Sequence, residues 1–134
     1  MTQHIRRAVA QLVLLQDGTY HIDGCDIKGH PLGYGADFLC QELRDYEQAL
    51  AFLDYLFISR LGDTLGGDRM IVQIRDGMAY VGYDDDPHFV RSNGHLTCTA
   101  DSFEQLLRDW LRVLEVQPQR VTVVQEGSCV QLLS

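Results

Sequence analysis

The chain lacks the features that mark a membrane or exported protein. No apolar run approaches the ~20 residues that a helix needs to cross a bilayer, so no transmembrane helix is expected. The opening segment from Met1 to Arg7 has basic residues but no adjoining apolar core that ends in a small-residue cleavage site, as a signal peptide would have. We therefore expect a cytoplasmic protein.

The chain also lacks the common motifs of catalytic and metal sites. It has no Gly-x-Ser-x-Gly elbow and no phosphate-binding loop that ends in Lys-Ser/Thr. The four cysteines, none of which forms a Cys-x-x-Cys pair, are Cys25, Cys40, Cys98 and Cys129. In a cytoplasmic protein such thiols are expected to be free and mostly buried. The sequence thus favours a protein that is not an enzyme and that holds no cofactor or metal.

Lysine is almost absent, because Lys28 is the only one and the other basic residues are arginines. With 19 acidic and 11 basic residues, the net charge is −8 and the isoelectric point is about 4.9. Such a charge repels phosphate backbones, which disfavours nucleic-acid binding, and it suits a basic partner. The length of 134 residues is typical of one domain, which we expect to span residues 1–134.

What the chain does contain is an internal repeat. Gln16-Asp17-Gly18 is echoed by Arg75-Asp76-Gly77, and a third copy of this step stands at Gln125-Glu126-Gly127. The other matches are Gly24 with Gly82, Asp26 with Asp84, His30 with His88, Cys40 with Cys98, and Tyr46–Leu50 with Phe103–Leu107. This pattern predicts a duplicated unit, at about residues 7–62 and 68–115, followed by a C-terminal hairpin at 120–133.

Each echoed turn predicts a β-hairpin, since both positions of a type I′ turn need positive φ and Asp-Gly supplies them. The expected facing pairs are Leu15–Tyr20 and Val13–Ile22 in the first hairpin, and Ile74–Ala79 and Val72–Val81 in the second. Two helices and a run of hairpins, without long β-α-β crossovers, predict an α+β fold. We expect an antiparallel sheet built from a duplicated ββ(β)α unit plus the C-terminal hairpin, with two main helices packed on it.

The helix boundaries are less sharply marked. Short extended stretches are expected at 38–43 and 95–99, before each helix. The first helix is expected to begin with Asp45 as N-cap, with Gln48 closing a capping box, and to end at Gly62. An alternative starts it at Asp37 and runs it unbroken.

The second helix is expected to take Ser102 as its N-cap. Its apolar stripe contains Phe103, Leu107 and Trp110 at helical spacing, so Trp110 is expected in the core.

Two clusters have the residue types of a metal site without its spacing. Asp84, Asp85 and Asp86 are consecutive, whereas a calcium loop spaces its oxygen ligands at alternate positions. We interpret this run as a solvated surface that attracts a cationic partner. The echoed pairs His30 with Cys40 and His88 with Cys98 match no zinc motif, and we interpret them as structural.

Three segments of the second unit follow one another in a familiar order. They are Gly66-Gly67-Asp68, a strand that ends in Val81–Pro87, and a helix that opens with Ala100–Leu107. This half of the chain resembles the C-terminal half of the SUKH superfamily, whose members end a sheet with an acidic turn and open a helix with Ala-Asp-Ser-Phe-Glu. The resemblance implies a non-catalytic role, because many of those proteins are bacterial immunity proteins that bind and neutralise a toxin domain.

The leading hypothesis is therefore a cytoplasmic immunity protein that covers a basic toxin surface. The residues expected to contact the partner are Asp63, Asp68, Asp84, Asp85, Asp86 and His88. One rival is a small enzyme or small-molecule-binding domain, with a pocket between helices and sheet lined by Tyr34, His30 and Cys40. Another is a self-associating scaffold subunit or homodimer that pairs through the edge of the third hairpin.

Replacing Asp84, Asp85 and Asp86 by serine should slow capture of the partner and weaken the salt dependence of binding. Association rates measured at several ionic strengths test this. Unchanged binding at low salt would show that these carboxylates are not part of the contact surface.

Overall fold

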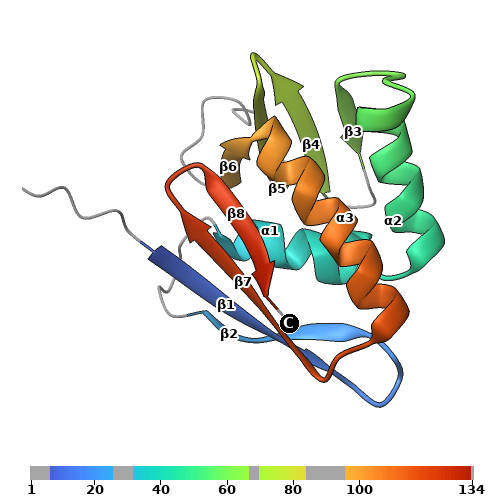
Figure 1. The fold of residues 1–134 in the computed structure, drawn as a ribbon, viewed down its shortest axis with the longest axis vertical. Helices are drawn as coiled ribbons and strands as arrows, with labels where there is room; N and C mark the ends of the chain where they lie inside the picture. The colour runs from blue at the N-terminus through green and yellow to red at the C-terminus, as the bar shows by residue number, and fades with distance from the viewer. Residues whose placement is uncertain (1–6, 26–31, 67–69, 84–95, 134) are drawn as a thin grey trace, which may run out of the picture.

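The computed structural model describes residues 7–25, 32–66, 70–83 and 96–133. Their strands form two four-stranded sheets, ordered β2-β1-β7-β8 and β3-β4-β5-β6 (Figure 1). The first sheet contains β1 (Arg7–Leu14), β2 (Tyr20–Cys25), β7 (Arg120–Glu126) and β8 (Cys129–Leu133). The second contains β3 (Thr64–Gly66), β4 (Met70–Arg75), β5 (Met78–Tyr83) and β6 (Leu96–Thr99). All pairings are antiparallel, so the expected α+β class is confirmed, with the strands divided between two sheets.

Three helical regions connect and cover the sheets. The helix α1 (Leu32–Asp37) continues into a π-helical segment, η1 (Phe38–Glu42), and α2 (Tyr46–Leu53) continues into a second one, η2 (Asp54–Ile58). The longest helix is α3 (Ala100–Val116). Among the described residues, no helix combines the length and the apolar character that spanning a membrane requires.

The first sheet joins the two ends of the chain. Its central pair is β1 with β7, from Arg7 opposite Glu126 to Val13 opposite Arg120. The third hairpin therefore completes the sheet that the first hairpin begins. The two sheets meet where the Thr99 amide donates to the Ser128 carbonyl at 2.9 Å.

The echoed turns adopt three different conformations. In the first hairpin Leu14, not Leu15, faces Tyr20, so the expected register is wrong by one residue. The cause is the Asp17 side chain, whose Oδ1 accepts the Thr19 amide at 3.0 Å and favours a longer loop in which only Gly18 has positive φ (85°). The repeat boundaries stay a prediction, since the echoed residues share a hairpin but not its geometry.

The second hairpin follows the sequence rule. Asp76 and Gly77 have φ of 51° and 76°, as a type I′ turn requires, and the expected facing pairs, Ile74–Ala79 and Val72–Val81, are confirmed. In the third hairpin Glu126 still pairs with Cys129. Its turn is therefore Gly127-Ser128, one residue later than expected.

The stretch 38–43 was expected to be extended, and it is mostly helical. Leu32, Ala36, Leu39 and Leu43 follow a helical period and are all at most 1% exposed, so burial of this stripe favours a helix from Leu32 to Glu42. The predicted N-cap of α2 is confirmed, because Asp45 Oδ1 accepts the Gln48 amide at 2.8 Å. The chain thus makes a helix on each side of Asp45, with a break between them.

Two other helix ends differ from the expectation. The N-cap of α3 is Thr99, whose hydroxyl accepts the Ser102 amide at 3.1 Å. Ser102 is free for another role, and its hydroxyl bonds the amide and carbonyl of Val130 on β8, at 2.7 and 2.9 Å. The helix that begins after Asp45 ends with η2 at Ile58 rather than at Gly62, and Arg60 takes the left-handed conformation with φ of 51°.

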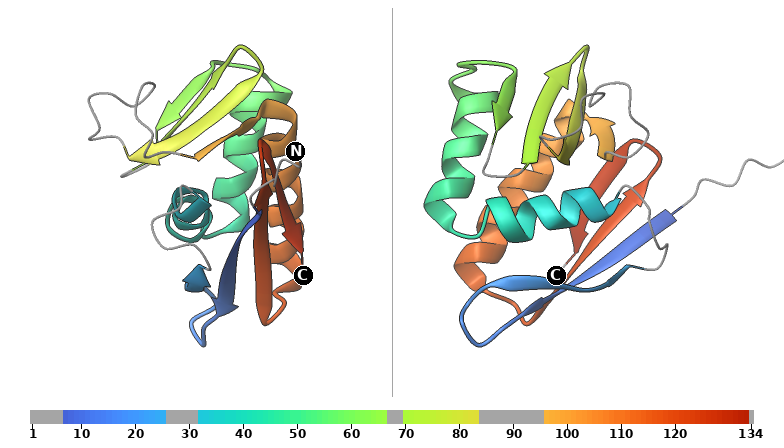
Figure 2. Two further views of the ribbon diagram at one scale, coloured as in Figure 1. Left: turned by 90° about the vertical axis from the view of Figure 1, so that its left-hand side faces the viewer. Right: turned by 180° about the vertical axis from the view of Figure 1, so that it is seen from behind.

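The α1–η1 region lies between the two sheets (Figure 2, left). It is tied to the second sheet by Tyr83 Oη, which donates to Asp37 Oδ2 at 2.9 Å, and by the Met70 amide, which donates to Glu42 Oε1 at 3.1 Å. It is tied to α3 by Trp110 Nε1, which donates to the Leu43 carbonyl at 2.8 Å. Trp110 is 0% exposed, as predicted for a core residue.

Replacing Trp110 by Phe should lower the free energy of unfolding by about 2–4 kcal/mol. The variant leaves the buried Leu43 carbonyl without its donor and opens a cavity beside Tyr20, whose ring lies 5.4 Å from the indole. Urea titration followed by circular dichroism measures this. Tryptophan fluorescence would not serve, because Trp110 is the chain's one tryptophan and the variant removes it. Arg112→Gln, at an exposed position of the same helix, should change stability by less than about 0.5 kcal/mol, and equal losses in the two variants would contradict the assigned role of Trp110.

Candidate functional site

The structure places only part of the predicted contact surface. Asp63 is described and exposed, just before β3. The other predicted contact residues, Asp68, Asp84, Asp85, Asp86 and His88, lie outside the described residues, as does His30 of the rival pocket.

Two of the thiols that the structure describes are buried and held in the neutral form. Cys40 and Cys98 are 8% and 0% exposed, as expected, whereas Cys129 is exposed. Burial raises the pKa of Cys40 and of Cys98 from the ordinary value of 9.0 to about 12, and the nearby Asp37 and Cys129 add to the shift. Since the thiolate is the reactive form, these two residues are inert near neutral pH.

A polar hollow of about 430 Å³ lies beside η1, and it differs from the predicted pocket. Its lining residues are Asp17, Thr19, His21, Cys40, Gln41, Glu42 and Arg44. Cys40 belongs to it, but Tyr34 packs edge-on against Tyr83 instead, with ring centroids 5.5 Å apart. The hollow therefore has both Cys40 and His21 in its lining.

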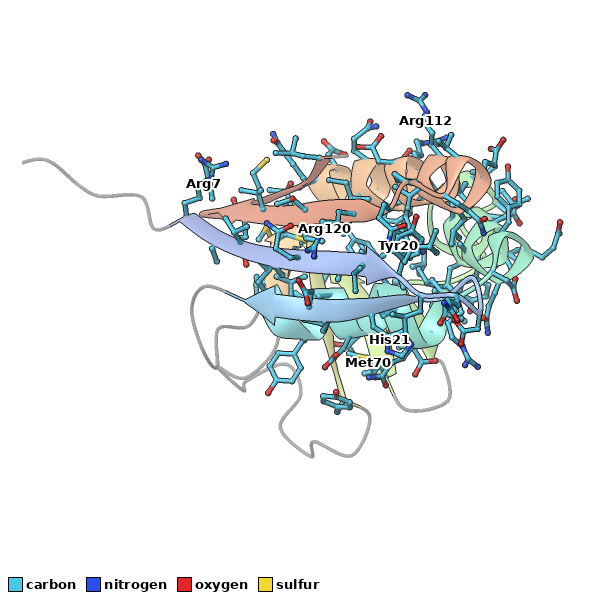
Figure 3. The ribbon with its side chains drawn as sticks, turned by 90° about the horizontal axis from the view of Figure 1, so that it is seen from below. Arg7, Tyr20, His21, Met70, Arg112 and Arg120 are labelled. Atoms are coloured by element: carbon cyan, nitrogen blue, oxygen red, sulfur yellow. The ribbon has the colours of Figure 1, made fainter. Side chains whose placement is uncertain are left out.

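The polar hollow contains a chain of hydrogen-bonding groups. The Thr19 hydroxyl donates to Asp17 Oδ1 at 2.6 Å and lies 3.2 Å from His21 Nε2. Hydrogen bonds from the hydroxyl and the amide of Thr19 lower the pKa of Asp17. Figure 3 shows His21 on the opposite side of β2 from Tyr20, away from the core. The histidine is oriented, but within the described residues no group of three His, Cys, Asp or Glu side chains is placed to hold a metal ion.

A second hollow, which we call the acidic groove, lies beside η2. It measures about 520 Å³, and its lining residues are Leu56, Phe57, Arg60, Gly62, Asp63, Ile74, Ala100, Asp101 and Glu104. These residues come from the end of η2 with the turn that follows it, from β4 and from the start of α3. The groove therefore contains Asp63 and lies where three stretches that are separate in sequence meet.

The turn from Ser59 to Asp63 is firmly held. Three backbone hydrogen bonds hold it. The Ser59 amide donates to the Asp54 carbonyl at 2.7 Å, the Leu61 amide donates to the Tyr55 carbonyl at 2.9 Å, and the Ile74 amide donates to the backbone carbonyl of Asp63 at 2.7 Å. Gly62 lies against the Tyr55 ring, and a Cβ there would come 2.5 Å from the Tyr55 hydroxyl. The sequence thus builds a fixed turn, with glycine at the position where a side chain would collide.

Charge on the rim of the acidic groove is mostly unpaired. Glu104 is paired with Arg108 at 2.8 Å. Within the described part of the chain, the side chains of Asp63, Asp101 and Arg60 make no hydrogen bond or ion pair. Two carboxylates and one guanidinium are therefore available to a partner, with negative charge in excess.

Two large exposed apolar side chains stand next to lining residues of the groove in sequence. Ile58 and Leu61 are 54% and 69% exposed, on either side of the exposed Arg60. The floor is made by Leu56, which is 6% exposed, and by the half-buried Phe57 and Ile74. The arrangement is an apolar surface rimmed by carboxylates, a combination found at surfaces that bind other molecules.

No protein-family model, curated protein or solved structure matches the chain.

Sequence interpretation missed Asp101, Ile58 and Leu61 as site residues. Asp101 was treated as part of a helix opening, although its place two residues after the cap puts it on the rim of the first turn. Ile58 and Leu61 follow the apolar stripe of a helix, and nothing in their spacing tells an exposed pair from a buried one. The available signal was their closeness to Gly62, which predicts the end of the helix, because apolar residues at a helix end are often exposed.

Stability should fall as the pH rises from about 9 to about 12. The unfolded chain loses the protons of Cys40 and Cys98 near pH 9, whereas the folded chain keeps them until about pH 12, so their contribution is complete below pH 9 and lost above it. Urea midpoints measured across this range under reducing conditions test the effect. Cys98→Ala should reduce the pH dependence, and Cys129→Ala, at an exposed position, should preserve most of it, because burial is the larger cause of the Cys98 shift; the reverse order would contradict the burial argument.

Proposed function

We propose that this chain is a non-catalytic protein-binding module that uses the acidic groove to hold its partner. The observation that carries the proposal is the juxtaposition of an apolar floor with two unpaired carboxylates, Asp63 and Asp101. Apolar contact supplies affinity, and complementary charge supplies fast association with a basic surface. The net charge of −8 adds a long-range attraction between the chain and a basic partner.

Within this class, the chain acts as an immunity protein that neutralises a toxin domain in the bacterial cytoplasm. This choice is supported by the resemblance of its second half to SUKH proteins and by its acidic character. Asp101 and Glu104, which belong to the helix opening that carries the resemblance, also line the acidic groove. Asp68, Asp84–Asp86 and His88 extend the proposed contact beyond the described residues.

A small-molecule-binding domain is the second candidate, and the polar hollow is the observation that favours it. Its oriented His21 and its mixed charges would suit a small polar ligand. Cys40, the one cysteine lining that hollow, is held as a neutral thiol, which weighs against a cysteine-histidine enzyme there.

Self-association through the edge of the third hairpin has less support. β8 is an edge strand, but α3 lies alongside it, and Ser102 occupies the amide and carbonyl of Val130 that a further strand would need (Figure 1). A neighbouring copy would have to pair beyond Val130.

The test is whether a gene next to the one for this chain encodes a toxin domain, and whether the chain binds that domain. Asp63→Lys with Asp101→Lys should lower the association rate at low salt by about tenfold or more, because two attractive carboxylates become repulsive. The matched control is Glu47→Lys with Glu115→Lys, which changes net charge equally at exposed positions away from the groove.

Surface binding kinetics and rescue of growth in cells that express the toxin give the readout. Failure of the unaltered chain to bind or protect would end the immunity proposal. Equal slowing in both double variants would assign the effect to net charge and not to the acidic groove.

A further inference from the structure

We infer that the occupant of the acidic groove is a short linear segment of a partner protein, in which a large apolar side chain stands next to arginine or lysine. This inference rests on the proposed function and specifies the chemistry of the partner at that site. Three observations point to it, namely the concave floor of the groove, the fixed turn that carries exposed apolar side chains next to it, and its charge.

The floor is hollow enough to accept a protruding side chain. Its volume of about 520 Å³ falls within the range of roughly 300–1,000 Å³ that ligand pockets occupy. Leu56, Phe57 and Ile74 are its large apolar lining residues, and Leu56 is 6% exposed, so an apolar group gains the most contact there. A flat protein surface would leave this hollow filled with water, whereas a side chain on an exposed segment would reach the floor.

Two exposed apolar side chains stand next to the lining in sequence. Leu61, between the lining residues Arg60 and Gly62, is 69% exposed, and Ile58, which follows the lining residue Phe57, is 54% exposed. A polypeptide is long enough to contact side chains that do not line the hollow, whereas a small molecule inside it is not. The turn that carries them is already fixed by the hydrogen bonds of the Ser59 and Leu61 amides and by the fit of Gly62 against Tyr55. Binding therefore costs little backbone entropy at this turn.

Charge selects a basic segment over the alternatives. Asp63 and Asp101 stand unpaired on the rim, and Arg60 is the cation that the groove presents to solvent within the described residues. Arginine or lysine next to the inserted side chain would meet these carboxylates. A second copy of this chain would instead bring the same carboxylates against each other, and a nucleic acid would bring phosphates.

Selection of random peptides of about twelve residues, displayed on phage, tests the inference with a defined probe. The selected pool should be enriched in arginine or lysine within a few positions of Leu, Ile, Phe, Met or Trp. Synthetic versions should lose about tenfold or more in affinity toward Leu61→Ser and toward the double variant Asp63→Asn with Asp101→Asn.

Val116→Ser is the matched control, because Val116 is also 69% exposed but lies at the far end of α3. Affinity unchanged by Leu61→Ser, or lowered equally by Val116→Ser, would overturn the inference. So would a selected pool without basic residues, or no enrichment at all. If no peptide is selected while the chain still binds and neutralises a folded toxin domain, the linear-segment inference fails and the proposed function stands.

Discussion

The fold depends on the polar groups of one buried segment, α1–η1 with Leu43, that lies between the two sheets. Each must find a partner, since a buried carboxylate or carbonyl without one destabilises the folded state. Asp37 receives the Tyr83 hydroxyl, Glu42 receives the Met70 amide, and the Leu43 carbonyl receives the Trp110 indole. The three donors come from β5, β4 and α3, so this one segment orients the second sheet and the long helix together.

Both hollows lie beside the ends of helical regions, where an α-helix has continued into a π-helical segment. The π-helical segment η1 lines the polar hollow, and η2 lines the acidic groove. In a π-helical segment the hydrogen bonding is less regular than in an α-helix, and such segments are frequent at functional sites. Here the second one ends in a turn with left-handed Arg60, which exposes Ile58 and Leu61 instead of burying them.

Local rules predicted those parts of the structure that local forces decide. Asp76-Gly77 gave its hairpin because both residues could take positive φ, and Asp45 capped its helix because its side chain reaches the Gln48 amide. The same rules failed where another bond competed, as when the Asp17 carboxylate took the Thr19 amide and lengthened the first loop. The acidic groove was out of reach for another reason. Asp63, Ile74 and Asp101 become neighbours only when separate segments pack, and one sequence carries no record of that contact.

The pairing of β1 with β7 limits when the first sheet can form during protein synthesis. Residues 7–13 pair with residues 120–126, so nearly the whole chain must leave the ribosome before the first sheet has its central partner. In the second sheet, by contrast, every strand pairs with the next one along the chain, so none of its pairings has to wait for a distant segment. Until β7 has been synthesised, one edge of β1 therefore has unpaired backbone N–H and C=O groups. A chaperone or another nascent chain can bind that edge during this interval.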